Sequence, residues 1–368
     1  MSNDITAFVG LDVHKGSIAI AVAEPGREAP RFLGTTGPEL ADLTKALSRV
    51  GRPEQLLLAY EAGPCGYALA RELAGRGYCC EVIAVAKIPR KPGERVKTDR
   101  RDALMLARYL RAGELTAVSV PDERDEAIRD LSRAREDAVG ARLKARQQLK
   151  AMLLRHGYKY EGKTSWTAAH ERYLAQVCFD HPAQSITFAE YRNAVQEADE
   201  RVERVTAALR EQVAGWRWAV VVQALMSLRG IDFIAATTVV AELGDFSRFA
   251  HPKELMSYLG LVPSEYSTGE SRVQGKITKT GNAHVRRVLI ESAWTYRYPA
   301  RMSLKITARN QGQPKAVRDI SWRAQLRLCA RYRRFAARGV AQNKICVAIA
   351  RELTGFLWDV ARHAPTKA

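Results

Sequence analysis

The sequence has no long apolar run. No stretch approaches the roughly 18 apolar residues that a membrane-spanning helix requires. The first residues, MSNDITAF, also lack the basic and apolar regions of a secretory signal peptide. We therefore expect a cytoplasmic protein that has no membrane partner.

Paired cysteine motifs are also missing. The six cysteines are scattered, and none forms a C-x-x-C pair with a second pair at zinc spacing. This excludes the usual zinc modules and favours reduced thiols.

Acidic residues are scarce toward the carboxyl end. The chain of 368 residues carries 58 Lys and Arg against 40 Asp and Glu, a net charge of +18. Residues 221–368 hold 24 basic and 10 acidic side chains, which is +14 of that excess. Such a concentration is typical of a domain that neutralises phosphates, so nucleic acid is the expected partner.

The first 115 residues alternate between strand-like and helix-like segments. Strands are expected near residues 5–13, 17–24, 54–63 and 80–86, and helices near 38–51, 66–78 and 98–113. A further strand is expected before the first helix. This order predicts an α/β domain of the RNase H/RuvC-like type over residues 1–115, with helices packed on a mixed sheet.

The rest of the chain is predicted to be mainly helical. Two long charged helices, near 122–155 and 186–214, indicate a coiled-coil hairpin, an arm spanning residues 116–222. An ordinary helical subdomain is the alternative. The third domain, 223–368, opens with two short helices around Gly230, a helix-hairpin-helix pattern that can offer N–H groups to a phosphate or serve packing alone. Farther along, a helix, a polar Gly-rich loop that contains SEYSTGES (residues 264–271) and another helix are expected.

Four acids fall where this fold would bring them together. Asp12 lies within the first strand and Glu61 ends a later one, and these two strands are neighbours in an RNase H-like sheet. Asp99 and Asp102 lie three residues apart at a helix start, so they share a face. Clustered carboxylates must bind protons or cations, and Mg²⁺ prefers such oxygen ligands. The structural alternatives are a helix cap for Asp99 and a solvated strand end for Glu61.

A basic stripe lies near the carboxyl end. Between Arg297 and Arg338 there are 12 Lys or Arg and one acid, Asp319. Five of these arginines recur every three or four residues on one helical face and would repel one another unless phosphates lie against them. They are Arg323, Arg327, Arg331, Arg334 and Arg338. Further phosphate contacts are expected from Lys276, Lys279, Arg286 and Arg287.

Five motifs in this order resemble the DEDD-type insertion-sequence transposases, the bridge-RNA-guided recombinases. They are GLDVHK, YEAGPCGY, KTDRRDA, YLGLVPSEYSTG and ITKTGNAHVRRVLIESAW. The resemblance implies a Mg²⁺-binding Asp, Glu, Asp, Asp set, here Asp12, Glu61, Asp99 and Asp102. It also implies a nucleophilic serine in the carboxyl-terminal domain, donor and target DNA chosen by a guide RNA, and homodimers that assemble into a homotetramer.

The family pattern places a serine beside a glycine after GLxP, where this chain reads Ser267, Thr268, Gly269. We predict Ser267 as the nucleophile because a primary hydroxyl attacks phosphorus more readily than a β-branched secondary one. Thr268 is the next candidate and Ser271 the third. A serine hydroxyl needs activation by a base or a metal, and no His-Asp partner stands at an obvious spacing from Ser267.

The resulting hypothesis is a transposase that cuts and rejoins DNA through a phosphoserine link, assisted by Mg²⁺. The first alternative is a Holliday-junction resolvase-like endonuclease that uses the same carboxylates and a water nucleophile. A second alternative is a nucleic-acid scaffold in which the carboxylates are structural.

Overall fold

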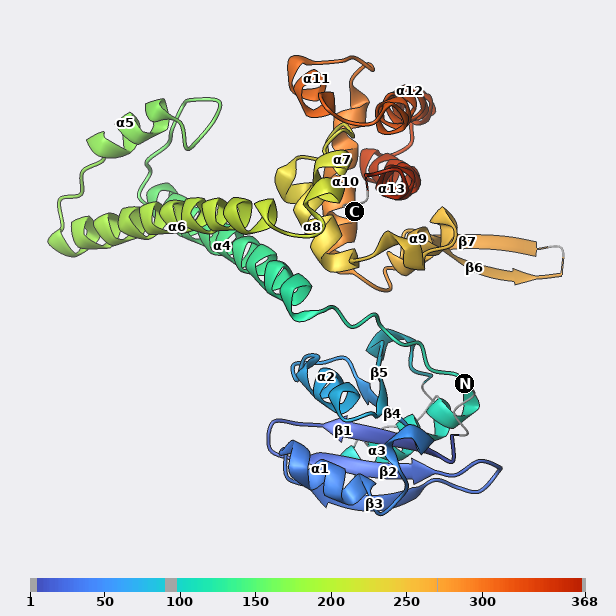
Figure 1. The fold of residues 1–368 in the computed structure, drawn as a ribbon. Helices are drawn as coiled ribbons and strands as arrows, with labels where there is room; N and C mark the ends of the chain where they lie inside the picture. The colour runs from blue at the N-terminus through green and yellow to red at the C-terminus, as the bar shows by residue number, and fades with distance from the viewer. Residues whose placement is uncertain (1–4, 90–97, 270, 366–368) are drawn as a thin grey trace. The chain divides into compact units, whose positions relative to one another are not determined.

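The computed structural model describes residues 5–89, 98–269 and 271–365 (Figure 1). The chain divides into two compact units, Met1–Asp122 and Glu123–Ala368. The division into three parts at 115 and 222 stays a prediction. Among the helices described, none is long and apolar enough to cross a membrane.

The first unit contains a five-stranded mixed sheet in the order β3-β2-β1-β4-β5. Its strands are β1 (Ala7–Val13), β2 (Ile18–Ala23), β3 (Arg31–Thr36), β4 (Leu56–Glu61) and β5 (Cys79–Ile83). β2 is antiparallel to both β1 and β3, whereas β1, β4 and β5 run parallel. The mixed α/β prediction is confirmed, including the central position of β1 beside β4.

Helices cover both faces of this sheet. Large apolar residues of the strands, such as Leu11 and Leu58, form one core with Leu43 of α1 (Leu40–Leu47) and Leu73 of α2 (Ala68–Gly75). The opposite face carries small residues, and α3 (Asp99–Ala112) packs there through Ala103 and Ala107. Because side chains alternate along a strand, the two faces of the sheet carry different residues, and Phe8, Leu57 and Ile83 pack against Leu106 and Leu110 farther along α3.

Two long helices begin the second unit. α4 (Glu123–Arg155) and α6 (Pro182–Ala214) pack along each other, with α5 (Ala168–Gln176) in the connection between them (Figure 1). The buried residues of α6 include a seven-residue repeat: Phe188, Val195, Val202 and Leu209. A repeat of seven is the pattern of helices that pack with a slight supercoil. The paired long helices are present, while the coiled-coil assignment stays a prediction.

The remainder of the second unit is a helical core around α13 (Gln342–Arg362). This helix packs on α7 (Ala219–Leu225), α9 (Pro252–Tyr258), α10 (Ala283–Ala293) and α12 (Lys315–Ala337). The other helices are α8 (Phe233–Leu243) and α11 (Leu304–Asn310). The prediction of a helical carboxyl-terminal region is confirmed.

The turn between α7 and α8 has a packing role. Gly230 adopts a φ of +84°, and a Cβ there would lie 2.7 Å from both the carbonyl oxygen of Ser292 and Oγ1 of Thr295. Glycine therefore lets the turn approach the end of α10 closely. The carboxylate of Asp232 caps α8 by accepting a hydrogen bond from the Ala235 N–H at 2.9 Å. Phosphate binding by this turn stays a prediction.

The prediction of a polar loop around SEYSTGES (residues 264–271) is wrong. The segment forms an antiparallel hairpin of β6 (Pro263–Thr268) and β7 (Ser271–Ile277). Most of its side chains are polar and exposed, so the sequence shows no apolar alternation. The backbone ladder and cross-strand polar pairs hold the strands instead.

Candidate functional site

Asp12 and Glu61 lie on the two central strands of the first unit. Leu11 of β1 is in register with Tyr60 of β4, and Asp12 and Glu61 are the next residues along these parallel strands. Neighbouring residues in register point to the same face of a sheet. The register therefore sets the two carboxylates side by side, on the face that α3 covers.

α3 crosses this face in direct contact with β1. A Cβ at Gly10 would collide with the carbonyl oxygen of Ala103 and would lie 2.5 Å from the Ala107 nitrogen, so only glycine fits. Gly10 of β1 therefore lies directly against Ala103 of α3. Asp99 precedes Ala103 by one turn, roughly 6 Å along the helix. Asp12 follows Gly10 by two residues, roughly 6.6 Å along the strand. The matched steps bring Asp99 beside Asp12.

His14 joins these two acids. Its Nε2 lies 3.3 Å from Oδ2 of Asp12 and 3.5 Å from Oδ1 of Asp99. One ligand atom of each residue lies within 4.8 Å of the others, which suits coordination of one cation. The Asp12 side chain is 14% exposed and that of His14 52%, so the group opens to solvent. Sequence reasoning missed His14, although it lies two residues after Asp12.

The charges around Asp12 act against its ionisation. Burial is the largest cause that raises the pKa of Asp12, and the carboxylates of Asp102 and Asp99 raise it further, while His14 opposes them. Asp99 and Asp102 thus both act on Asp12 electrostatically, and a cation bound between such carboxylates would relieve their repulsion. Glu61 is placed beside them by strand register.

Asp99 is not the helix cap. The side chain of Thr98 accepts the hydrogen bond from the Arg101 N–H at 3.3 Å, which caps α3. The helix therefore does not need Asp99 as its cap, and the side chain of Asp99 is 60% exposed. Both aspartates lie in the first turn of α3, where the helix dipole favours negative charge.

Ser267 lies on β6 of the second unit, in a polar array that the sequence did not reveal. Its Oγ donates a hydrogen bond to Oε1 of Glu265 at 3.0 Å. Arg272 donates to both oxygens of the same carboxylate, at 3.1 and 3.0 Å. Hydrogen bonds from Arg272, Gln274 and Ser267 lower the pKa of Glu265. The predicted nucleophile therefore has a carboxylate partner two residues away.

The other two hydroxyl candidates, Thr268 and Ser271, lie on the opposite face of this hairpin. Thr268 is in register with Ser271, whereas Ser267 is in register with Arg272. Because side chains alternate along a strand, Thr268 and Ser271 face away from the carboxylate of Glu265.

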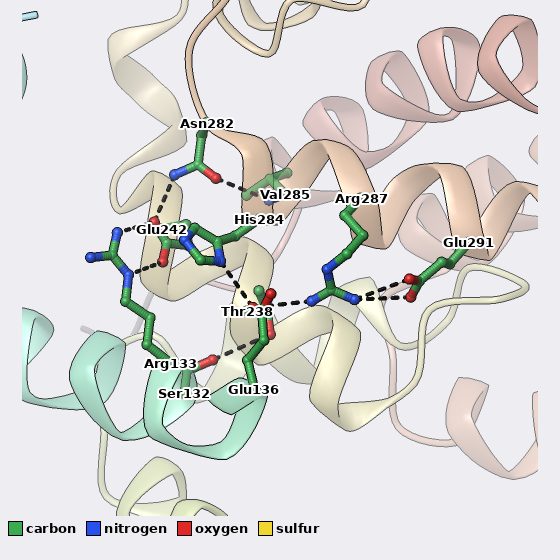
Figure 2. Close-up of polar contacts among 10 residues, drawn as sticks. All are labelled: Ser132, Arg133, Glu136, Thr238, Glu242, Asn282, His284, Val285, Arg287 and Glu291. Atoms are coloured by element: carbon green, nitrogen blue, oxygen red, sulfur yellow. Dashed lines mark hydrogen bonds and ion pairs between the residues drawn. The ribbon is translucent and has the colours of Figure 1, made fainter. Parts of the chain in front are cut away.

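A buried polar network fixes the helix that follows the hairpin (Figure 2). Glu242 of α8 accepts hydrogen bonds from Arg133 of α4 at 2.7 and 3.0 Å and from Asn282 at 2.6 Å. Asn282 in turn caps α10 by accepting from the Val285 N–H at 2.9 Å. Burial acts to raise the pKa of Glu242, but the bonds from Arg133 and Asn282 outweigh it and leave the pKa lowered.

Two of the four basic residues predicted around the hairpin have internal partners. Arg286 donates to the carbonyl oxygens of Leu259 and Thr280 at 3.0 and 2.9 Å. Arg287 forms ion pairs at 3.1 Å with Glu136 and Glu291 (Figure 2). Lys276 and Lys279 are exposed. Phosphate contacts by all four stay a prediction.

The arginine stripe on α12 is partly neutralised by acids of α13. Arg327 and Arg331 pair with Glu352 at 2.9 and 2.6 Å, and Arg323 lies 3.5 Å from Asp359. The premise that the stripe needs phosphates to relieve its repulsion is wrong for these three, because a neighbouring helix supplies carboxylates. Arg334 and Arg338 are exposed, and no ion pair with another described residue is found for either. They are the freest cations of the stripe.

Both units match known transposase families. The family described as Transposase IS116/IS110/IS902 family matches residues 222–305, and a DEDD family of IS110 elements, described as Transposase, matches residues 9–157. The first match includes the serine hairpin, and the second includes all four predicted acids.

Whole-length relatives agree. A putative transposase of Sinorhizobium fredii (strain NBRC 101917 / NGR234) is 50% identical over 360 residues, 97% of this chain and 89% of the relative. The transposase for insertion sequence element IS1533 of Leptospira borgpetersenii is 31% identical over 336 residues, 89% of this chain and 95% of the relative. The chain therefore belongs to the IS110/IS116/IS902 family of DEDD insertion-sequence transposases.

Proposed function

We propose that this transposase cuts and rejoins DNA through a covalent phosphoserine intermediate on Ser267, with divalent-metal assistance from the acids of the first unit. The observation that carries the proposal is the convergence of Asp12, Asp99 and Asp102 where β1 and α3 meet. The exposed Ser267, with its carboxylate partner, supports the serine step.

The donor set fits a divalent cation. Hard carboxylate oxygens on Asp12, Glu61, Asp99 and Asp102 are the ligands that Mg²⁺ prefers, and the open side of the cluster leaves room for the waters that this ion retains. His14 supplies one nitrogen donor. Bound there, Mg²⁺ would stabilise the charge that builds up on a phosphate during cleavage. These residues would hold the ion within an RNase H/RuvC-like domain.

The nucleophile and the acids belong to different units of the chain. A composite active site that joins Ser267 to the acids, in one chain or across a homodimer or homotetramer, is part of the proposal. Within it, the protein positions the hydroxyl and the metal-binding carboxylates against one DNA phosphate.

We further propose that a bridge-type guide RNA selects donor and target DNA. The excess of +14 over residues 221–368 supports contacts to nucleic-acid backbones. A protein that leaves sequence choice to an RNA needs backbone contacts more than base contacts. Lys276, Lys279, Arg334 and Arg338 are the exposed cations best suited to them. Deep sequencing of RNA that copurifies with the protein tests this, and random host RNA would contradict it.

The second candidate is a resolvase-like endonuclease that uses water as its nucleophile. It is favoured by one observation: Asp12, His14 and Asp99, whose ligand atoms lie within 4.8 Å of one another, all belong to the first unit. Under this mechanism, Ser267→Ala would cleave DNA fully and no adduct would form. The serine mechanism predicts that this variant loses both the adduct and strand exchange.

The scaffold alternative makes a third prediction. If the carboxylates are only structural, Asp12→Asn retains every nucleic-acid activity of the protein. A denaturing gel of wild type, Ser267→Ala and Asp12→Asn with one labelled DNA separates the three mechanisms.

A further inference from the structure

The hairpin β6–β7 presents one polar face made of four residues. Glu265 is in register with Gln274, and Ser267 with Arg272. Glu265 and Ser267 lie two residues apart, so all four side chains share one side of the ribbon. The Glu265 carboxylate is the centre of the array, since it accepts hydrogen bonds from the other three.

We propose that Glu265 accepts the proton of the Ser267 hydroxyl during DNA cleavage and that Arg272 binds the phosphate under attack. This inference rests on the proposed phosphoserine mechanism, to which it adds a base and an anion clamp. The Ser267 Oγ already donates to Glu265 Oε1 at 3.0 Å, which is within the reach required of a general base.

The chemical step balances as an exchange of alcohols on phosphorus. The Ser267 O–H bond breaks and its proton passes to the Glu265 carboxylate, while Oγ forms a bond to phosphorus. The phosphorus–oxygen bond to one deoxyribose breaks, and that sugar oxygen leaves as a hydroxyl after taking up a proton from water. Rejoining is the reverse: an incoming sugar hydroxyl attacks phosphorus and gives its proton to water, the bond from phosphorus to Ser267 Oγ breaks, and Oγ regains its proton from Glu265.

Arg272 links substrate binding to the strength of this base. Without DNA, its guanidinium is held by both oxygens of Glu265, and this contact lowers the pKa of the carboxyl. A DNA phosphate offers the same fork-shaped acceptor. The Arg272 side chain is 68% exposed, so a phosphate can reach it. Once Arg272 turns to the phosphate, Glu265 loses its strongest partner and becomes a better proton acceptor beside Ser267.

A purely structural role is the competing explanation. Cross-strand polar pairs of this kind help to hold the two strands of a hairpin together. In that case Glu265 would close the ribbon, and an isosteric amide, which still accepts hydrogen bonds from Arg272 and Ser267, would serve equally well.

The test uses the full-length protein with the RNA that copurifies with it and a labelled DNA substrate under single-turnover conditions. We expect Glu265→Gln to slow formation of the covalent protein–DNA adduct about 100-fold, the lower end of what a general base contributes. The DNA dissociation constant should not rise, because the neutral amide competes less well than the carboxylate with a phosphate for Arg272. Glu265→Asp should restore part of the rate, because it keeps a carboxylate.

The matched control is Ser264→Ala, which removes another serine hydroxyl from β6. The Oγ of Ser264 donates a hydrogen bond to the carbonyl oxygen of Lys276, and it lies on the opposite face of the ribbon from Glu265. It should form the adduct at the wild-type rate. Arg272→Ala should weaken DNA binding as well as slow the adduct, because it removes the phosphate contact.

Two outcomes overturn different claims. An adduct rate for Glu265→Gln equal to that of wild type would overturn the role of Glu265 and leave the phosphoserine mechanism standing. An adduct that persists in Ser267→Ala would overturn the mechanism itself, and the role of Glu265 with it.

Discussion

The acidic cluster and the serine hairpin are built in opposite ways. Asp12 is fixed on the central strand β1 directly after three buried residues, Val9, Gly10 and Leu11, and α3 packs over this strand at Gly10. Ser267 lies on a two-stranded ribbon whose side chains are nearly all exposed. An isolated ribbon of this kind is only marginally stable in water.

This contrast has a functional meaning. A cation site requires ligands held at fixed separations, which a packed core provides. A nucleophile that attacks DNA and then carries it through strand exchange requires access, which an exposed ribbon provides. We infer that the first unit holds the metal ligands rigidly and that the serine hairpin of the second unit makes the nucleophile accessible to DNA.

The largest expected effect comes from removing the central ligand. Asp12→Asn should lower metal-dependent cleavage more than about 100-fold, since a catalytic metal contributes several kcal/mol. The stability of the metal-free protein should hold or rise, because the variant removes repulsion from Asp99 and Asp102. Cleavage assays and chemical denaturation measure the two effects. Glu28→Gln, an exposed acid elsewhere in this unit, is the control and should cleave normally.

The second prediction breaks the rigid side of the comparison. Gly10→Ala introduces a Cβ that collides with the backbone of α3, and such overpacking costs about 1–3 kcal/mol. The displaced helix should also carry Asp99 away from Asp12 and weaken divalent-metal binding. Gly16→Ala has nothing within 4 Å and should change neither property. Equal urea midpoints for the two variants would show that α3 does not need this close approach.

The third prediction concerns the base of the hairpin. Glu242→Gln should cost about 1–3 kcal/mol at pH 7, because it replaces a buried carboxylate that receives hydrogen bonds from Arg133 and Asn282. The pKa of Glu242 is lowered from 4.5, so its contribution is present above pH 4.5 and is lost as the pH falls below it. The wild-type advantage should therefore shrink in acid.

Urea unfolding at pH 7 and near pH 4 measures this difference. Glu291→Gln changes a carboxylate whose side chain is 63% exposed and should cost less than about 0.5 kcal/mol. A wild-type advantage over Glu242→Gln that grows in acid would contradict the assigned direction of the pKa.

The smallest effect is expected at the nitrogen donor. His14→Ala should weaken Mn²⁺ binding roughly tenfold and Mg²⁺ binding less, because imidazole suits transition metals better than it suits magnesium. Isothermal titration with each ion measures both, and His363→Ala at the end of α13 is the control. Unchanged affinity for both ions would exclude His14 as a ligand.

The sequence predicted the first unit better than it predicted the serine hairpin. Apolar runs fixed β1, β2, β4 and β5, and the pairing of β1 with β4 followed from the expected sheet, so Asp12 and Glu61 could be placed side by side before the structure was known. The helix of α3 was equally clear, with Thr98 before it and Gly113 after it. These features depend on local pattern and on one sheet topology.

What the sequence did not reveal depends on contacts between segments. The ribbon β6–β7 has no apolar alternation, so its strands were missed, and with them the placement of Glu265 beside Ser267. The acids that pair with the arginine stripe of α12 are Glu352 and Asp359 of α13, later in the chain. The spacing of the arginines does not predict these partners. Such partners appear only when the helices are packed.

The most direct test of the central claim is to map the covalent DNA adduct by mass spectrometry in the presence and absence of divalent metal. The account predicts a phosphodeoxyribonucleotide on Ser267, formed only with metal and absent from Asp12→Asn. Full cleavage by Ser267→Ala with no protein-bound DNA would contradict it and favour a water nucleophile at the acidic cluster.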